Sequence, residues 1–303
     1  MEEWQIESSG GLAQLHAVCW LPDGEPVGVL QLVHGMQEYI LRYERLAVFF
    51  CTHGYVVCGH DHLGHGDSLI DGRRGFFGED HPVERLVEDV DLVRREIGGR
   101  FAGKPYFLFG HSMGSFVTRL YFTKYADGLA GAILCGTSGP AAAERAVKPF
   151  LRLLWKLRGA QAVFPRLAQL ISKRYNKRFE AEGPNAWISR DREALDAYNR
   201  DPKVQFYFTV SALWALLEML DRISARDWPK RLPRSLPMLL TSGADDPVGN
   251  FGEGVRTIYD RMMQRGFDDL EIAIYYDCRH ELMNEKNRDE ILADWLAWLS
   301  ARR

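Results

Sequence analysis

Hydrophobic and polar positions divide the chain into short apolar runs and longer amphipathic stretches. The patterns at 2–8 and 12–21 predict two opening strands, joined by Ser9, Gly10 and Gly11. The run at 27–33 is almost unbroken, as expected of a strand buried on both faces of a sheet. Further short runs predict strands at 55–59, 106–109, 129–135, 237–241 and 270–276.

Helical spacing of apolar residues separates most of these strands. The stretch 81–97 is amphipathic at the helical period, and Gly98 and Gly99 are expected to end that helix. Other helices are predicted at 43–53, from the end of 110–114 to about 125, at 252–265 and from about 287 to 301. Strands that alternate with helices in this way predict an α/β protein with a mostly parallel sheet covered on both faces.

The block 138–226 interrupts that alternation. It contains several helical patterns and no convincing strand. We interpret it as a helical cap segment inserted into a core made of residues 1–137 and 227–303. An insertion at this point of the chain is expected to lie over the carboxyl ends of the strands, where open α/β sheets bind ligands.

Composition and charge narrow the classes of protein that remain. The chain has 303 residues, of which 46% are hydrophobic and 26% charged, as in a globular domain with a large core. A net charge of -3 gives no overall attraction to nucleic acid. The N-terminus lacks the apolar region of a signal peptide, and no stretch approaches the roughly 18 apolar residues of a transmembrane helix. The scattered cysteines show no pairing pattern, so we expect a cytoplasmic protein with reduced thiols; they are Cys19, Cys51, Cys58, Cys135 and Cys278.

The strongest chemical signal is the sequence GHSMG at 110–114, between a predicted strand and a predicted helix. A serine on so tight a turn adopts a strained backbone that pushes its hydroxyl toward a substrate. The glycines at 110 and 114 are expected where strand and helix pass closely. We therefore predict Ser112 as a nucleophile, rather than as part of an ordinary glycine-serine turn.

A serine nucleophile needs a base, and the base needs a carboxylate that orients it. His280 directly follows the last predicted strand and completes the chain order serine, acid, histidine. The acid is expected after the preceding strand, where Asp245 and Asp246 compete. Asp246 is preferred because Pro247 favours an extended conformation before it, while Asp245 is free to hydrogen-bond the turn.

Backbone N–H groups are expected to complete the site. The segment His34-Gly35-Met36 follows the strand at 27–33, and Met113 begins the helix behind Ser112. The N–H groups of Met36 and Met113 are the donors that we predict for an oxyanion hole.

These motifs resemble those of the monoglyceride lipase and lysophospholipase branch of the α/β-hydrolases, which are hydrolases of the serine aminopeptidase S33 type. The matching stretches are 34–39 with Arg42 and Tyr43, then 61–68, 110–114, 243–248 and 279–281. The resemblance implies the α/β-hydrolase fold, a triad of Ser112, Asp246 and His280, and an oxyanion hole at Met36 and Met113. It also implies that the enzyme needs no cofactor or metal and that the cap segment, 138–226, gates and binds the substrate.

The histidine loop, residues 59–66, allows a second interpretation. Its sequence comes close to the H-x-H-x-D-H zinc motif of metallo-β-lactamase-like hydrolases, but Gly64 stands where that motif has aspartate. Few histidines follow it in the chain, so a two-metal site lacks ligands. We therefore expect the loop to form a tight turn that braces the oxyanion side.

The cap segment holds a basic amphipathic stretch. Residues 145–178 include ten lysines or arginines and no acid, interleaved with apolar residues from Phe150 to Ile171. This pattern suits a lipid–water interface, so peripheral contact with a membrane is one interpretation. The other is an ordinary cap whose charges face water.

Taken with the resemblance, these features predict a serine hydrolase that cleaves carboxylic esters through an acyl-enzyme, with a monoacylglycerol or a lysophospholipid as substrate. Two alternatives stay open. One is an amidase or aminopeptidase with the same triad, and the other is a non-catalytic ligand receptor on the same fold.

Overall fold

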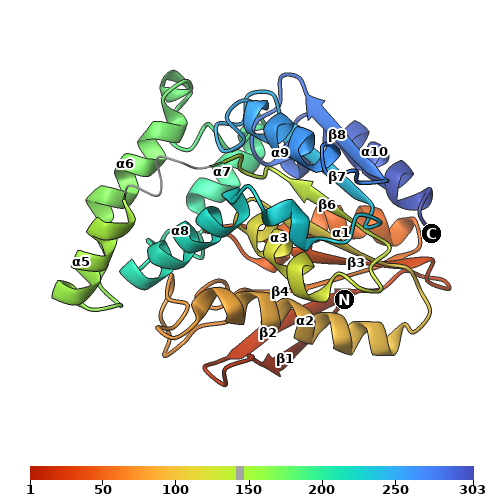
Figure 1. Ribbon diagram of the computed structural model, residues 1–303, viewed down its shortest axis with the longest axis horizontal. Coiled ribbons are helices and arrows are strands. Elements are labelled where there is room, and N and C mark those ends of the chain that lie inside the picture. Colours follow the sequence, from red (N-terminus) through yellow and green to blue (C-terminus); the bar gives the residue numbers. More distant parts are fainter. Residues whose placement is uncertain (141–146) are drawn as a thin grey trace.

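The computed structural model describes residues 1–140 and 147–303 and has a mixed β-sheet at its centre (Figure 1). The strands lie in the order β1-β2-β4-β3-β5-β6-β7-β8. The pairs β1–β2 and β2–β4 are antiparallel, and all the others are parallel. The strands are β1 Glu2–Glu7, β2 Gln14–Trp20, β3 Gly28–Val33, β4 Tyr55–His60, β5 Tyr106–His111, β6 Gly131–Cys135, β7 Met238–Gly243 and β8 Leu270–Tyr275. The predicted mostly parallel α/β sheet is confirmed.

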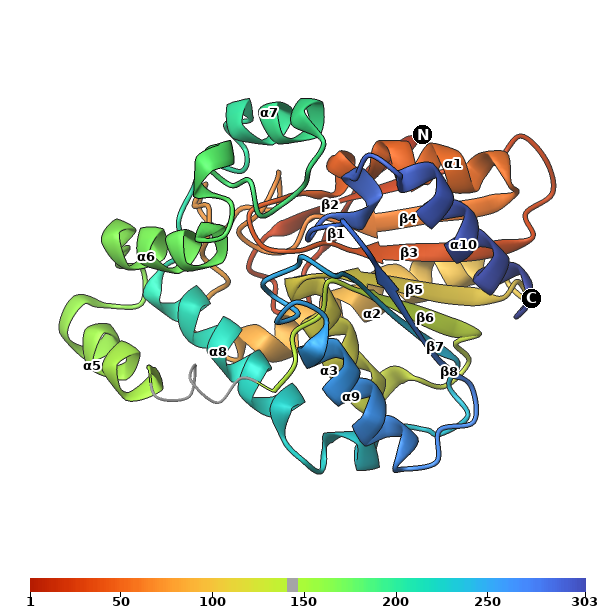
Figure 2. The ribbon, with the colours of Figure 1, turned by 90° about the horizontal axis from the view of Figure 1, so that it is seen from above.

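Helices cover both faces of this sheet (Figure 2). One face packs against α1 (Glu44–Thr52) and α10 (Arg288–Ser300), and the other against α2 (Pro82–Arg100), α3 (Met113–Tyr125) and α9 (Glu253–Met263). Every residue of β3, β4, β5, β6 and β7 is buried, as the apolar runs predict for strands covered on both sides. A short 3-10 helix, η1 (Ile40–Tyr43), leads into α1.

Only helical elements occur between β6 and β7 in the part of the cap segment that the structure describes. They are α5 Lys148–Arg158, α6 Pro165–Asn176, η2 Glu180–Glu182, α7 Arg192–Arg200 and α8 Val210–Ser224. Helix α8 packs on α3, α2 and α5, whereas α5 and α6 lie at the outer edge of the molecule (Figure 1). A last 3-10 helix, η3 (Trp228–Arg231), follows α8, and η4 (Leu282–Asn284) lies between β8 and α10.

One predicted boundary is wrong. Gly98 and Gly99 do not end the helix that precedes β5, because α2 continues to Arg100. Neither glycine has a positive φ, and the turn falls instead at Gly103, whose φ is 79°. Glycine in a helix costs about 1 kcal/mol relative to alanine but does not forbid the helix. The apolar side of α2, which packs on the sheet up to Ile97, outweighs that cost.

The described residues include no helix that is both long enough and apolar enough to cross a lipid bilayer. All five cysteines lie in this part of the chain and are free thiols. Four of them are buried, as expected of cysteines that pack as small apolar residues; Cys51 is the partly exposed one.

Candidate active site

Ser112 stands between the end of β5 and the start of α3. Its φ of 51° and ψ of -121° form a left-handed conformation that is rare for a residue with a side chain. Such a conformation costs on the order of 1–3 kcal/mol and persists only when the surroundings fix it. Here the N–H of Ser112 donates to the carbonyl of Cys135 (2.9 Å), and Ser115 donates to the carbonyl of Ser112. The predicted strained turn is therefore present.

The two glycines of the GHSMG motif allow the backbone to pass closely at this turn. A Cβ on Gly114 would lie 1.9 Å from the carbonyl oxygen of Val33. A Cβ on Gly110 would lie 2.4 Å from Oγ1 of Thr118. Larger residues would force α3 away from β3 and β5, and Ser112 would move with α3.

The structure brings together the three side chains of the predicted triad. Nε2 of His280 lies 2.8 Å from Oγ of Ser112. Nδ1 of the same ring lies 3.0 Å from both carboxylate oxygens of Asp246. These separations suit an imidazole that donates to the carboxylate through Nδ1 and accepts the serine hydroxyl at Nε2.

Asp246, not Asp245, faces His280. Asp246 is fully buried and also accepts the N–H of Val248 at 2.9 Å. Asp245 is partly exposed, and its N–H donates to the carbonyl of Cys278. The carboxylate that can orient the imidazole is therefore the one that precedes Pro247, as the sequence predicted.

The N–H groups of Met36 and Met113 lie in the segments that border Ser112. Met113 is the first residue of α3, so its N–H has no acceptor within the helix. Among the described residues, neither N–H donates to another protein group. Both are free to meet a negative oxygen beside Ser112, and the dipole of α3 adds positive potential there.

A buried network that the sequence did not reveal supports this edge of the site. The guanidinium of Arg42 makes a two-pronged ion pair with Glu281 (2.9 and 3.0 Å) and also contacts Glu38. Burial alone would raise the pKa of Glu281, but the Arg42 charge outweighs burial and lowers the pKa to about 2. Oε1 of Glu38 accepts Nδ1 of His111 at 2.9 Å. Burial lowers the pKa of His111, yet the Glu38 carboxylate outweighs burial, so the net shift is upward.

This network fixes residues on both sides of the triad. His111 precedes Ser112, and its ring lies 4.8 Å from that of His280, while Glu281 follows His280 directly. The motifs at 38–43 and 279–281 contain Glu38, Arg42 and Glu281, but their pairing is visible only in the folded chain.

The pocket against Ser112 is small, and the cap segment forms part of its wall. Its volume is about 30 Å³. Trp187 and Ile188 of the cap segment lie over the pocket, and we call this part its roof. The ring of Trp187 lies 5.0 Å from that of His280. The lining residues are Met36, Gln37, Glu38, His111, Ser112, Trp187, Ile188, Tyr198, His280 and Glu281. The lining thus combines residues of the core with Trp187, Ile188 and Tyr198 of the cap segment.

Residues 179–191 of the cap segment are fastened to the His280 loop, residues 276–288. The guanidinium of Arg279 donates to the carbonyl of Ala186 (2.7 Å) and to Glu182 (2.5 Å). The N–H of Glu281 donates to the carbonyl of Ile188 at 2.8 Å. Two further ion pairs join Arg190 to Glu285 and Arg288 to Asp191. This part of the roof is thus held by the same loop that carries His280.

The histidine loop contacts both ends of the segment 34–40, which contains Met36. The N–H of His62 donates to Nε2 of His34 at 2.8 Å, and the carboxylate of Asp61 accepts the N–H of Ile40 at 2.7 Å. Gly64 and Gly66 have φ values of 76° and 48°, which confirms the tight turn. Burial lowers the pKa of His62 to about 4 and that of His65 to about 3, so both rings stay neutral.

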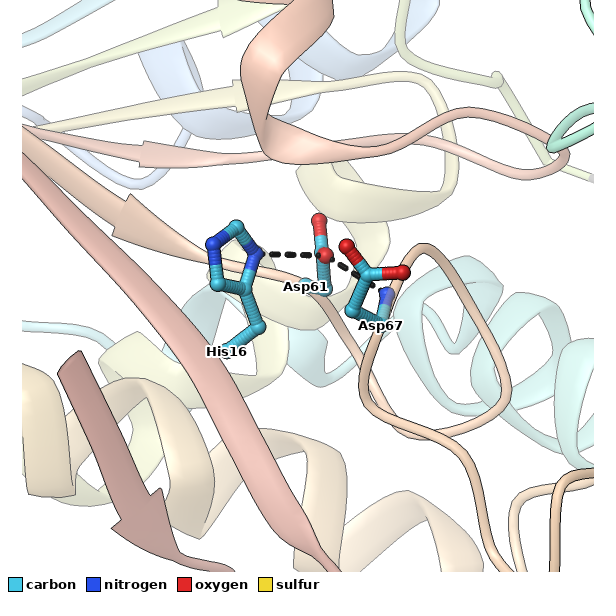
Figure 3. Close-up of side chains that lie close together, drawn as sticks. All are labelled: His16, Asp61 and Asp67. Carbon is cyan, nitrogen blue, oxygen red and sulfur yellow. Dashed lines mark hydrogen bonds and ion pairs between the residues drawn. The ribbon is translucent and has the colours of Figure 1, made fainter. Parts of the chain in front are cut away.

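A zinc site in the histidine loop receives no support from the positions of its histidines. Within the described residues, a group of three potential metal ligands forms only at His16, Asp61 and Asp67 (Figure 3). His16 is already engaged on both ring nitrogens, since Nδ1 contacts Asp61 and Nε2 contacts Glu3, each at 2.9 Å. The cationic imidazole of His16 therefore links strand β2, which carries it, to Glu3 of strand β1 and to Asp61 of the histidine loop.

The folded protein is expected to lose stability as the pH rises from about 6.5 to about 9, because His16 loses its proton. The hydrogen bond to Asp61 is the largest influence on His16, and with help from Glu3 it overcomes burial and raises the pKa to about 9. The unfolded chain releases that proton near pH 6.5. The stabilisation is therefore complete below pH 6.5 and is lost as the pH rises through about 9, with a slope of up to about 1.4 kcal/mol per pH unit.

Urea unfolding at several pH values from about 6 to 9.5 measures this slope. His16→Gln should flatten the pH dependence in this range, because glutamine has no proton to lose there. His53→Gln removes an exposed histidine at the end of α1 and should leave the wild-type slope. Parallel curves for wild type and His16→Gln would show that His16 does not carry the effect.

Comparison with known proteins relates this geometry to a family. The family model Hydrolase_4, described as serine aminopeptidase, S33, matches residues 24–287. The monoacylglycerol lipase of Mycolicibacterium smegmatis is 29% identical over 302 residues, which cover 98% of this chain and 96% of the relative. The human monoglyceride lipase is 29% identical over 290 residues, with 93% of this chain and 86% of the relative covered.

Among solved structures, a highly thermostable carboxyl esterase from Bacillus coagulans in complex with glycerol superimposes with a TM-score of 0.93. It is 30% identical to this chain, and the alignment covers 99% of this chain and 98% of the esterase. The predicted resemblance is thereby confirmed. The chain belongs to the serine aminopeptidase S33 family of α/β-hydrolases, within its monoglyceride lipase-like branch.

Proposed function

We propose that the protein cleaves a single-chain lipid ester, a monoacylglycerol or a lysophospholipid, with Ser112 as the nucleophile. The observation that carries the proposal is the continuous contact from Ser112 through His280 to the buried carboxylate of Asp246. A hydroxyl next to a properly oriented imidazole is the arrangement that activates serine for attack on a carbonyl.

The reaction then follows two steps of acyl transfer. Oγ of Ser112 attacks the ester carbonyl while Nε2 of His280 takes its proton, and Asp246 stabilises the resulting imidazolium. The N–H groups of Met36 and Met113 hold the negative oxygen of the tetrahedral intermediate. His280 returns the proton to the alcohol that leaves, and a water molecule repeats the sequence to release the acid.

The choice of a lipid ester rests on the relatives and on the roof of the site. The two sequence relatives named above are a monoacylglycerol lipase and a monoglyceride lipase. The roof residues Trp187 and Ile188 present apolar surface to the pocket, which suits an acyl chain. Tyr198 also lines this pocket, and a phenol hydroxyl suits the hydroxyl groups of a polar alcohol.

A panel of substrates tests this proposal. Esters of graded acyl length, a monoacylglycerol and a lysophosphatidylcholine should be assayed on the purified protein beside amides of the same acyl groups. We expect turnover of the esters, with kcat/KM rising with acyl length, and little turnover of the amides. Preferred cleavage of the amides would favour an amidase or aminopeptidase. Tight binding of these ligands without any turnover would favour a receptor.

We also propose that helices α5 and α6 rest on an anionic membrane surface. Large apolar side chains are exposed on them, including Phe150 (51%), Leu153 (52%), Leu157 (68%) and Leu170 (65%). Exposed basic residues are interleaved with them; in α5 these are Arg152, Lys156 and Arg158. This combination lets apolar groups insert shallowly while each cation near the surface contributes about 1 kcal/mol at most.

Not every lysine or arginine of the predicted basic stretch, residues 145–178, is available to contact lipid. Arg145 lies outside the described residues. Lys148 pairs with Glu218 and Asp221, and Arg178 stacks on the ring of Phe251. The membrane proposal therefore depends on the middle of the stretch.

Vesicle sedimentation at two salt concentrations tests the membrane proposal. Binding to anionic vesicles should exceed binding to zwitterionic ones and should weaken with salt, because charges are screened over about 8 Å at physiological ionic strength. Reversing Arg152, Lys156 and Arg158 to glutamate should remove the preference and leave hydrolysis of a short soluble ester intact. Reversing Arg256 in α9 and Arg265 just after it, both exposed and outside the cap segment, is the control. Equal binding of the wild-type protein to both vesicle types would contradict the membrane proposal, and α5 and α6 would then be an ordinary part of the cap segment.

A further inference from the structure

The oxyanion loop, residues 35–39, is held from two sides. It follows β3 and carries Met36, whose N–H is one of the two oxyanion donors in the function proposed above. On the core side, the N–H of Gly35 donates to Oε1 of Glu38, and the same oxygen accepts the hydroxyl of Tyr43 at 2.9 Å. These contacts fix the first and fourth residues of the loop, but not Met36 and Gln37 between them.

The side chain of Gln37 is held by the cap segment. Gln37 has a φ of 56°, an unusual value for a residue with a side chain, and its Nε2 donates to the carbonyl of Phe206. Two positions on, the hydroxyl of Tyr39 donates to Asp201 at 2.8 Å. Both acceptors belong to residues 201–206, between α7 and α8.

The acceptors themselves are anchored. The ring of Phe206 is buried and lies 5.4 Å from that of His65 in the histidine loop. Asp201 accepts the N–H of Lys203 at 2.8 Å, and Nζ of Lys203 pairs with Asp67 of the core at 2.7 Å. Residues 201–206 are thus anchored to the core, and they contact the oxyanion loop from the side of the cap segment.

We propose that Gln37 is a positioning residue that couples the cap segment to the oxyanion hole. Its amide holds Gln37 in its positive-φ conformation and so restrains the neighbouring Met36, whose N–H is then aimed at the position beside Ser112. When residues 201–206 move away, that restraint is released and one oxyanion donor is lost. The catalytic centre is therefore complete only while this part of the cap segment is closed.

The inference rests on the proposed function, so its experiment includes a reaction that reports the oxyanion hole directly. A thionoester places sulfur, a weak hydrogen-bond acceptor, where an ester places oxygen. An intact oxyanion hole therefore favours the oxygen ester strongly, and a damaged hole favours it less. The ratio of the two kcat values is the readout, and a general loss of folded protein would not change it.

Gln37→Met keeps the length of the side chain and removes the donor. We expect kcat for a short soluble ester to fall roughly 10-fold, below the 10²–10³-fold loss of a whole oxyanion donor. KM should change little, and the ester-to-thionoester ratio should fall by a similar factor. Gln37→Glu retains the size but places an acceptor against the Phe206 carbonyl, and should resemble Gln37→Met. Tyr39→Phe, which cuts the second contact, should shift the ratio in the same direction.

Gln169→Met is the matched control, because Nε2 of Gln169 in α6 donates to the hydroxyl of Tyr207 within the cap segment and does not contact the oxyanion loop. It should keep the wild-type ratio. If Ser112→Ala is inactive while Gln37→Met and Tyr39→Phe both keep the wild-type ratio, the coupling is overturned and the proposed function stands. If Ser112→Ala retains activity, the proposed function fails and the coupling fails with it.

Discussion

Replacing Ser112 with alanine is expected to lower kcat for ester hydrolysis by roughly 10⁶-fold. The substitution removes the atom that forms the acyl-enzyme, while His280 and the N–H groups of Met36 and Met113 keep their places. The remaining rate would come from substrate binding and oxyanion stabilisation alone. The substitution also leaves the backbone strain at position 112 unchanged, because alanine at a φ of 51° is strained in the same way as serine.

A fluorophosphonate probe gives a second measurement of the same prediction. It should label the wild-type protein at Ser112, since it reacts with a serine that a neighbouring base activates. Ser112→Ala should not be labelled, and Ser235→Ala, at an exposed position before β7, should be labelled normally. A chelator should leave the labelling unchanged. Labelling that persists on another serine of the Ser112→Ala protein would refute the mechanism.

Asp246→Asn is expected to lower kcat by roughly 10⁴-fold with little change in KM. The amide keeps the size of the carboxylate but presents its NH₂ or its oxygen to Nδ1 of His280, so it no longer fixes the tautomer or stabilises the imidazolium. The fold should tolerate the change, because the amide oxygen still has the N–H of Val248 as a partner. Circular dichroism and thermal unfolding would confirm that the protein remains folded.

Asp245→Asn is the matched control for this measurement. Its carboxylate is one residue away and partly exposed, and among the described residues no side-chain hydrogen bond joins it to His280. Its kcat should stay within a few-fold of wild type. A reversed ranking of the two variants would assign the acid to Asp245 and leave the fold as described.

The residues near Ser112 were predictable because each belongs to a local pattern with a fixed place in the chain. A strand, a GHSMG turn and a helix place Ser112, and the ends of later strands place Asp246 and His280. Parallel strands bring their carboxyl ends to one edge, so chain order alone suffices to gather these side chains. Pro247, which favours an extended conformation at the residue before it, was enough to choose Asp246 over Asp245 as the predicted acid.

The contacts that support these residues could not be predicted in the same way. Arg42 and Glu281 are 239 positions apart, and Gln37 and Phe206 are 169 positions apart. Their pairing depends on how the cap segment lies over the sheet, and helical periodicity identifies an apolar face without identifying what it packs on. In α5 that face is divided, since Leu151 is buried while Leu153 and Leu157 are exposed.

The fastening of residues 179–191 to the His280 loop limits how the cap segment can be exchanged in engineered chimaeras. A graft cut at 138 and 226 would take Arg190 and Asp191 from the protein and leave the fully buried Glu285 and the partly buried Arg288 in the host without these ion-pair partners. The loop that carries His280 would then be mispositioned even though Ser112, Asp246 and His280 all came from the host. Specificity transplants between relatives should therefore either replace 276–288 together with the cap segment or confine the exchange to helices α5 and α6.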